Sequence, residues 1–220
     1  MSTITQVSNT AATQGSVILL SGGIESSTLL HDEARRGEML YPLFIDYAQR
    51  AAQQEFAAAE HQCRQLGLAL KHLDLSAAGE AFRAGQEKRL HVPIPHRNLT
   101  LLSLSLSWAA QMRARRLLLA LNREDTTAYP SAGTDFLTHF RAIARTLADL
   151  DCEAPYIELG KAEVIERGVG LGVDYTHTYS CLLGYELACG ACPQCEKRRA
   201  AFENADQPDP TRYRPATRVQ

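Results

Sequence analysis

Residues 17–27 read Val-Ile-Leu-Leu-Ser-Gly-Gly-Ile-Glu-Ser-Ser, a short apolar run that ends in a serine and two glycines. The apolar run predicts a buried strand, and the spacing of apolar residues over 25–36 predicts a helix directly after it. Glycines let the backbone approach an anion closely, and the unpaired amides of a helix's first turn point toward that anion. We therefore expect a phosphate-binding loop between the strand and the helix.

A tight Gly-Gly turn followed by a serine cap is the simpler explanation of a bare glycine pair. The position of this pair favours phosphate, because nucleotide-binding loops follow the first strand of α/β folds. The loop has neither the lysine of a Walker A sequence nor the three glycines of a dinucleotide fingerprint. The loop residues expected to take part in nucleotide binding are Ser21, Gly22, Gly23, Glu25, Ser26 and Ser27.

Strand-like and helix-like stretches alternate along the rest of the chain. This alternation predicts an α/β fold with a parallel sheet covered on both faces, in which ligands bind outside the carboxyl ends of the strands. The predicted strands cover residues 17–21, 41–47, 69–75, 116–121 and 156–159. The predicted helices cover residues 25–36, 49–66, 98–115, 135–150 and 161–171.

The composition fits one globular domain, or one domain with a small appendage. The chain has 220 residues, of which 45% are hydrophobic and 22% charged. Its formal net charge of −2 argues against a nucleic acid as direct partner. No apolar run approaches the roughly 20 residues that span a bilayer, and the N-terminus does not resemble a secretory signal, so we expect a cytoplasmic protein without membrane contact.

Four of the six cysteines lie close together near the C-terminus, at Cys181, Cys189, Cys192 and Cys195. In a reducing compartment such a cluster indicates a metal site rather than disulfides. Four thiolates complete a tetrahedron and leave no position open for water, which favours structural Zn²⁺. An iron–sulfur cluster and a redox dithiol are the competing interpretations.

The loop Ser-Gly-Gly-Ile-Glu-Ser resembles the pyrophosphate loop Ser-Gly-Gly-x-Asp-Ser of the adenine-nucleotide α-hydrolase superfamily, whose members cleave ATP between the α and β phosphates. The resemblance implies a Rossmann-like parallel sheet of the HUP type, with ATP and Mg²⁺ as ligands. Glu25 stands where the superfamily has aspartate, so the charge is kept and the reach is one methylene longer. That family position has an Mg²⁺-linked role.

Further motifs make the chain similar to the 7-cyano-7-deazaguanine synthases of queuosine biosynthesis (QueC-like proteins) over roughly residues 17–202. Residues 46–50 (Asp-Tyr-Ala-Gln-Arg) resemble Asp-Tyr-Gly-Gln-Arg, residues 95–98 (Pro-His-Arg-Asn) resemble Pro-Gly-Arg-Asn, and residues 161–163 (Lys-Ala-Glu) are the same in both. The cysteine cluster resembles the family's zinc segment. Individually these matches are weak, and in this order they are strong.

The resemblance implies activation of the carboxylate of 7-carboxy-7-deazaguanine with ATP to an acyl-adenylate, capture by ammonia as an amide, and dehydration to a nitrile. It implies catalytic roles for Glu25, Arg97 and Lys161, and a nucleotide contact for Asp46. It also implies a homodimer. The implied substrate contacts are Tyr47, Gln49, Arg50, Arg97, Asn98 and Asp125. From the residues alone, Arg50 would be a solvated charge, Tyr47 a core residue, Asn98 a helix cap and Asp125 a turn residue.

One segment departs from the family pattern. Where the family reads Tyr-Pro-Asp-Cys-Arg, residues 129–133 of this chain read Tyr-Pro-Ser-Ala-Gly. The family segment is expected to help hold the deazaguanine, so this change, together with Glu25, indicates a diverged paralogue. Such an enzyme could deliver its acyl group to a protein amine, for example an N-terminus in an antiviral defence system.

We expect four units in the chain. They are a disordered leader over residues 1–15, an α/β ATP-binding domain over 16–175, a zinc-binding segment with a terminal helix over 176–206, and a flexible tail over 207–220. Two alternative functions remain open. One is another adenylating member of the superfamily, such as a tRNA thiolase or an amide synthetase, and the other is a non-catalytic nucleotide-binding scaffold.

Overall fold

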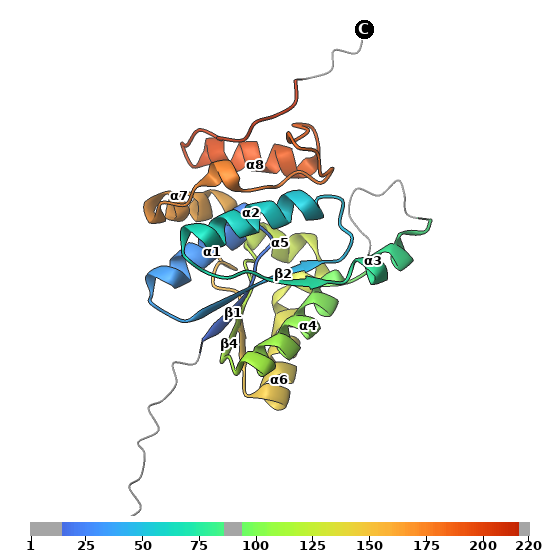
Figure 1. The fold of residues 1–220 in the computed structure, drawn as a ribbon. Helices are drawn as coiled ribbons and strands as arrows, with labels where there is room; N and C mark the ends of the chain where they lie inside the picture. Colours follow the sequence, from blue (N-terminus) through green and yellow to red (C-terminus); the bar gives the residue numbers. More distant parts are fainter. Residues whose placement is uncertain (1–14, 86–93, 216–220) are drawn as a thin grey trace, which may run out of the picture.

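The computed structural model describes residues 15–85 and 94–215. Within them, five parallel strands form one sheet in the order β3-β2-β1-β4-β5 (Figure 1). The predicted α/β fold is confirmed. The strands are β1 (Ser16–Leu19), β2 (Leu40–Asp46), β3 (Lys71–Asp74), β4 (Arg116–Leu118) and β5 (Asp151–Glu153).

Helices cover both faces of the sheet, as the near-continuous apolar strands require. Figure 1 shows α1, α2, α7 and α8 on one face, and α4 and α6 on the other. The helices are α1 (Ile24–Arg35), α2 (Ala52–Gln65), α3 (Ser76–Arg83), α4 (Arg97–Met112), α5 (Arg123–Ala128), α6 (Thr134–Ala148), α7 (Lys161–Leu171) and α8 (Pro193–Asn204), with short 3₁₀ turns η1 (Pro130–Ala132) and η2 (Tyr175–His177).

Alternate residues of the central strands enter two separate apolar clusters. Ile18 and Phe44 pack with the face that carries α1, α2, α7 and α8. Val17 and Leu43 pack with the face that carries α4 and α6. Because both faces are buried, the sheet offers ligands its carboxyl edge, and the order of the strands reverses there between β1 and β4.

The last predicted strand is wrong. Residues 156–159 form turns, and the fifth strand is Asp151–Glu153, which pairs with β4. The helix predicted to run to residue 150 ends at Ala148, because Asp149 adopts a left-handed conformation with φ of 47° and closes it. The apolar side chain of Tyr156 belongs to the core without belonging to the sheet, and its hydroxyl donates to Asp32 over 3.1 Å.

The ends of the chain also differ from expectation. Of the predicted leader, residues 1–14 lie outside the described residues, and Gly15 is buried beside Met39. The prediction of a flexible tail is wrong for residues 207–215, because these residues pack on the cysteine segment. Asp209 accepts from Arg198 over 3.0 Å, and Tyr213 forms a bridge with Ala188.

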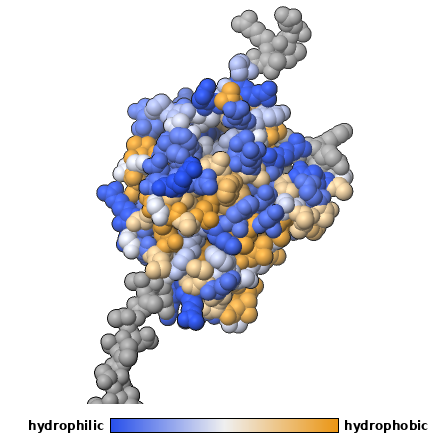
Figure 2. Space-filling model, in the orientation of Figure 1, coloured by the Kyte–Doolittle hydropathy of each residue, from blue (hydrophilic) through white to orange (hydrophobic). Residues whose placement is uncertain are grey.

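The surface differs between the two ends of the molecule. Figure 2 shows hydrophilic side chains concentrated over the upper part of the face in view, where α8 and its flanking segments lie, and apolar ones lower down, toward α4 and α6. Exposed apolar residues of α6 include Ile143 and Leu147. None of the helices within the described ranges is long and apolar enough to span a bilayer.

Candidate active site

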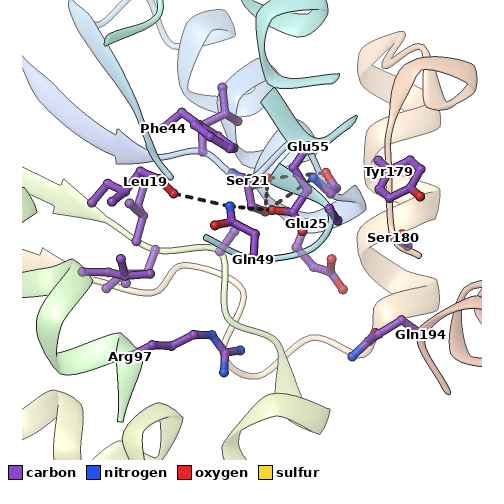
Figure 3. A pocket seen from close by; sticks show the side chains of 18 of the residues that line it. Leu19, Ser21, Glu25, Phe44, Gln49, Glu55, Arg97, Tyr179, Ser180 and Gln194 are labelled. Atoms are coloured by element: carbon purple, nitrogen blue, oxygen red, sulfur yellow. Dashed lines mark hydrogen bonds between the residues drawn. The ribbon is translucent and has the colours of Figure 1, made fainter. Parts of the chain in front are cut away.

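A cavity of about 300 Å³ opens at the carboxyl ends of β1, β2 and β4 (Figure 3). We call its two sides the sheet wall, made by lining residues from segments 19–26, 44–55, 97–101 and 119–121 and by residue 161, and the C-terminal wall, made by lining residues from segment 179–182 and by residue 194. The sheet wall lies where the order of the strands reverses, which is where ligands of open parallel sheets bind.

The loop between β1 and α1 contributes Ser21, Gly23 and Ser26 to the cavity. Gly22 has a φ of 72°, and a Cβ there would lie 2.4 Å from the carbonyl oxygen of Glu55. Only glycine therefore allows α2 to pack this closely against the loop. Gly23 begins α1 without a side-chain cap, and the Ser26 hydroxyl accepts from the Ser21 amide over 3.2 Å. The helix's first turn is thus open to an anionic ligand.

Glu25 and Lys161 form an ion pair in the cavity, across α1 and α7. The Asn122 side chain also donates to Glu25 over 2.8 Å. Burial alone would raise the pKa of Glu25, but Lys161 and Asn122 hold it below its usual value. Burial opposes the charge of Lys161 in turn, and Glu25 nevertheless raises its pKa. Both groups are therefore charged at neutral pH, and a fixed ammonium stands beside the predicted phosphate loop.

Glu55 is a second carboxylate of the cavity, in the first turn of α2. Its Oε2 accepts from Gln49 Nε2 over 3.0 Å, while Gln49 Oε1 accepts from the backbone of Tyr47 over 2.9 Å. Burial raises the pKa of Glu55 to about 7, because the nearby Arg97 does not offset the loss of water. The two carboxylates therefore differ in charge state near neutral pH.

Arg97 begins α4 and lies across the cavity from Gln49 in Figure 3. Its guanidinium stands over the ring of Tyr129, 5.6 Å from the centroid. Asn98 donates to the backbone of Ser131 over 3.0 Å. These contacts place the segment that departs from the family pattern directly behind the two α4 residues that line the cavity. Asn98 is not the helix cap considered above, because His96 occupies the N-cap position of α4.

Buried Arg198 of α8 holds the C-terminal wall from behind. It is 2% exposed and donates to Thr178 Oγ1 over 2.9 Å and to Ser180 Oγ over 3.3 Å. Between those residues, the Tyr179 amide donates to the carbonyl oxygen of Gly22 over 2.9 Å. The C-terminal wall is therefore tied to the predicted phosphate loop itself.

The four cysteines meet at the end of the C-terminal wall, with their sulfurs all within 4.8 Å of one another. The Sγ atoms of Cys192 and Cys195 are 3.5 Å apart, and those of Cys189 and Cys195 are 3.9 Å apart. Sulfurs around a tetrahedral zinc lie about 3.8 Å from one another, given a Zn–S bond of about 2.3 Å. The cluster therefore fits a four-thiolate metal site.

Backbone amides point at the sulfurs of the cluster. Cys181 Sγ accepts from the amides of Leu183 and Cys189 at 3.5 and 3.4 Å. Burial opposes ionisation of Cys189, but the amides of Ala191 and Cys192 prevail and lower its pKa to about 7. Amide donors of this kind stabilise thiolates, the form that binds a metal.

Of the predicted catalytic, nucleotide and substrate residues, ten line one cavity and four do not. Ser27 is fully buried, and its hydroxyl has no hydrogen-bond partner among the residues that the structure describes. Gly22 shapes the loop from behind, and Asp46 accepts from the Ala48 amide over 2.8 Å. Asp125 forms a capping box with Asn122, as its turn interpretation suggested. The predicted residues that line the cavity are Ser21, Gly23, Glu25, Ser26, Tyr47, Gln49, Arg50, Arg97, Asn98 and Lys161.

Several cavity residues were not predicted. Glu55 follows Gln49 by six residues inside an Ala- and Gln-rich helix, and nothing in that pattern marks it as buried. Asn122, which donates to Glu25 without lining the cavity itself, was also missed, because it precedes a helix of six residues that has no apolar periodicity. Tyr179, Ser180 and Gln194 flank the cysteines, and their position beside those ligands was the available signal.

The fold defines the class: an α/β protein with a five-stranded parallel sheet of the HUP type. Two solved structures share the fold. An NMN synthetase from Francisella tularensis has a TM-score of 0.59 and 17% identity, over 89% of this chain and 79% of that one. A 4-thiouridine synthetase, solved as an RNA complex with bound ATP, has a TM-score of 0.53 and 15% identity, over 88% of this chain and 50% of that one.

Sequence comparison gives the family. Residues 15–206 match the family described as queuosine biosynthesis protein QueC. A 7-cyano-7-deazaguanine synthase from Nitrosospira multiformis is 36% identical over 219 residues, which cover 90% of this chain and 94% of the relative. The chain belongs to the QueC family.

Proposed function

We propose that this protein is an ATP-dependent carbon–nitrogen ligase that adenylates the carboxylate of 7-carboxy-7-deazaguanine and couples it to an amine. The observation that carries the proposal is the half-buried Lys161–Glu25 pair, which holds a cation in the same cavity as the uncapped loop Ser21–Ser26. Relatives of similar length carry the name 7-cyano-7-deazaguanine synthase, and a structure with the same fold contains ATP.

In the proposed first step, a carboxylate oxygen of the acid attacks the α-phosphorus of ATP. The bond between the α and β phosphates breaks, and its electron pair leaves with pyrophosphate. Negative charge builds on the pyrophosphate, where the first-turn amides of α1 and the Lys161 ammonium stabilise it. Arg97 supplies a second cation from the opposite side of the cavity.

Glu25 keeps Lys161 in place in this proposal. A lysine buried without a partner would lose its proton, and a neutral amine would no longer attract phosphate. Mg²⁺ would supply further neutralisation of the triphosphate. The carboxylate of Glu25 already contacts Lys161 and Asn122. We therefore propose that the side chain of Glu25, which is longer than the family's aspartate, positions Lys161 rather than binding a metal ion.

Zn²⁺ bound by Cys181, Cys189, Cys192 and Cys195 would act as a structural ion, since four thiolates fill its coordination sphere. Its proposed role is to fix the C-terminal wall. Gln194 lies between two of these cysteines and points into the cavity in Figure 3. The ion would therefore set the position of one cavity side chain.

The acceptor amine is either ammonia, giving the amide or the nitrile 7-cyano-7-deazaguanine, or a protein amine such as an N-terminus. Segment 129–133, which departs from the family pattern, contacts Arg97 and Asn98 at the cavity wall. This change favours an acceptor other than ammonia. An antiviral defence system is one setting for transfer to a protein.

Exchange of radioactive pyrophosphate into ATP tests the proposal. We expect exchange that depends on 7-carboxy-7-deazaguanine, followed by AMP formation once an amine is added. Mass spectrometry of the products, with ammonia and with candidate protein acceptors, then identifies the amide, the nitrile or a protein adduct. Binding of ATP without exchange would support a scaffold, and exchange driven only by another acid or by a tRNA would support a different superfamily activity.

A further inference from the structure

We propose that Glu55 is the proton acceptor of the amine-coupling step, held in place for that role by Gln49. This inference rests on the proposed adenylation function. Glu55 lines the cavity from the first turn of α2, beside the phosphate loop that its backbone packs against. It was assigned no role by the sequence motifs.

The two cavity carboxylates are bound differently. Glu25 is ion-paired with Lys161 and accepts from Asn122, so it cannot take a proton without breaking that pair. Glu55 accepts from the neutral side chain of Gln49 at 3.0 Å. Of the carboxylates that line the cavity, Glu55 is therefore the one whose protonation leaves an ion pair intact.

Gln49 is a positioning residue in this arrangement. Its carbonyl oxygen accepts from the Tyr47 amide, and its nitrogen donates to Glu55 and, at 3.5 Å, to the carbonyl oxygen of Ile45. These bonds occupy both ends of the carboxamide. Figure 3 draws the bond from Gln49 to Glu55 as a dashed line. Gln49 thus fixes one oxygen of Glu55, a role that is separate from the substrate contact that the family resemblance implies.

The charged and titratable groups that face Glu55 come from three sides. Asp46, at the end of β2, disfavours its charge, while Arg97 of α4 favours it. Burial raises the pKa values of Tyr47 and Tyr179 above the ordinary range, and the negative charge of Glu55 raises them further. The balance leaves Glu55 with a pKa near neutrality, which is where a general base works best.

The chemistry of coupling requires such a group. As a neutral amine attacks the acyl carbon, the C–N bond forms and the C–O bond to AMP breaks, with its electron pair passing to the phosphate oxygen. The nitrogen must lose one proton for the amide to be neutral. Glu55 takes that proton and then releases it to water, so the carboxylate is restored for the next turnover.

The test compares Glu55→Gln with the wild-type protein in the two half-reactions. We expect pyrophosphate exchange, with an unchanged KM for the acid, and amide formation slowed by about 100-fold or more. Once each rate is divided by the fraction of amine that is neutral at that pH, product formation by the wild-type protein should still fall as the pH drops below about 7. This remaining decline should be absent from the residual activity of Glu55→Gln. Glu55→Asp should recover part of the rate.

Glu60→Gln, an exposed change on the same helix, is the matched control and should leave both half-reactions unchanged. Thermal unfolding checks that each variant is folded. A raised KM for the acid, or exchange lost in step with product formation, would show that Glu55 binds substrate or nucleotide and would overturn the inference. Absence of exchange in the wild-type protein would instead overturn the proposed function, and this inference with it.

Discussion

The two walls of the cavity are held by different kinds of interaction. The sheet wall stands on parallel strands whose side chains enter two large apolar clusters. The C-terminal wall rests on a small cluster around the cysteines and on buried Arg198. Removing one apolar contact should weaken the first wall only slightly, whereas the second depends on a few polar bonds and, in the proposed function, on a metal ion. The walls should therefore respond very differently to perturbation.

Loss of the metal site should have the largest effect. Cys192→Ser, or removal of the metal with a chelator, should release the C-terminal wall and lower turnover by at least about 100-fold, because structural zinc contributes folding free energy directly. The strands should remain, so far-ultraviolet circular dichroism should change little. Metal content and product formation are the measurements. Full activity in metal-free protein would show that the second wall stands without an ion.

Breaking the Lys161–Glu25 pair should perturb the sheet wall next most strongly. Lys161→Ala leaves the Glu25 carboxylate buried without its cation, which costs about 3–5 kcal/mol in the free energy of unfolding. Urea denaturation measures this loss. The double variant Lys161→Ala/Glu25→Gln should recover most of the stability and none of the pyrophosphate exchange. Recovery of exchange would contradict the role given to the ammonium.

Asp209→Asn should weaken the C-terminal wall by about 3 kcal/mol, since it leaves buried Arg198 without its carboxylate. Burial alone would raise the pKa of Asp209, but Tyr213 and Arg198 hold it below the usual value. The stability it contributes is therefore present above the unfolded pKa of about 3.8 and is lost as the pH falls through the folded value. Unfolding midpoints at pH 7 and pH 3 should differ less in the variant than in the wild type.

Glu25→Asp should have the smallest effect. The shorter side chain keeps the charge but cannot reach both Lys161 and Asn122, so one hydrogen bond, worth about 1 kcal/mol, is lost. We expect a fall in the exchange rate of roughly five-fold, by the same free energy. An increase in rate would show that the longer glutamate is a handicap in this cavity rather than part of its geometry.

The sequence was sufficient for the parts of the fold that depend on local patterns. The strand and helix around residues 17–36, and the turn between them, follow from apolar spacing and two glycines. Residues 156–159 were wrongly predicted as a strand because apolar side chains in a turn can be buried in the core just as those of a strand are. Tyr156 fills the core beside Asp32, and no local signal separates that outcome from sheet pairing.

Site residues could be predicted where they belong to sequence motifs in loops. They could not be predicted where their role depends on contacts between elements that are distant in the sequence. Lys161 and Glu25 were named separately, but their pairing depends on how α7 packs against α1. Glu55 and Gln194 were missed because burial of a polar side chain is decided by the elements packed around it. The packing of Asp209 on Arg198 was missed for the same reason, since a proline-rich polar sequence is typical of a tail.

Gln194 occupies one of the two positions that separate Cys192 from Cys195. Exchanging its side chain would leave the spacing of the thiols intact, so this position can vary chemically while its backbone stays anchored. Such a position is suited to evolutionary change in ligand preference. A saturation library at this codon, selected for new acyl acceptors, would sample that change without disturbing the rest of the molecule.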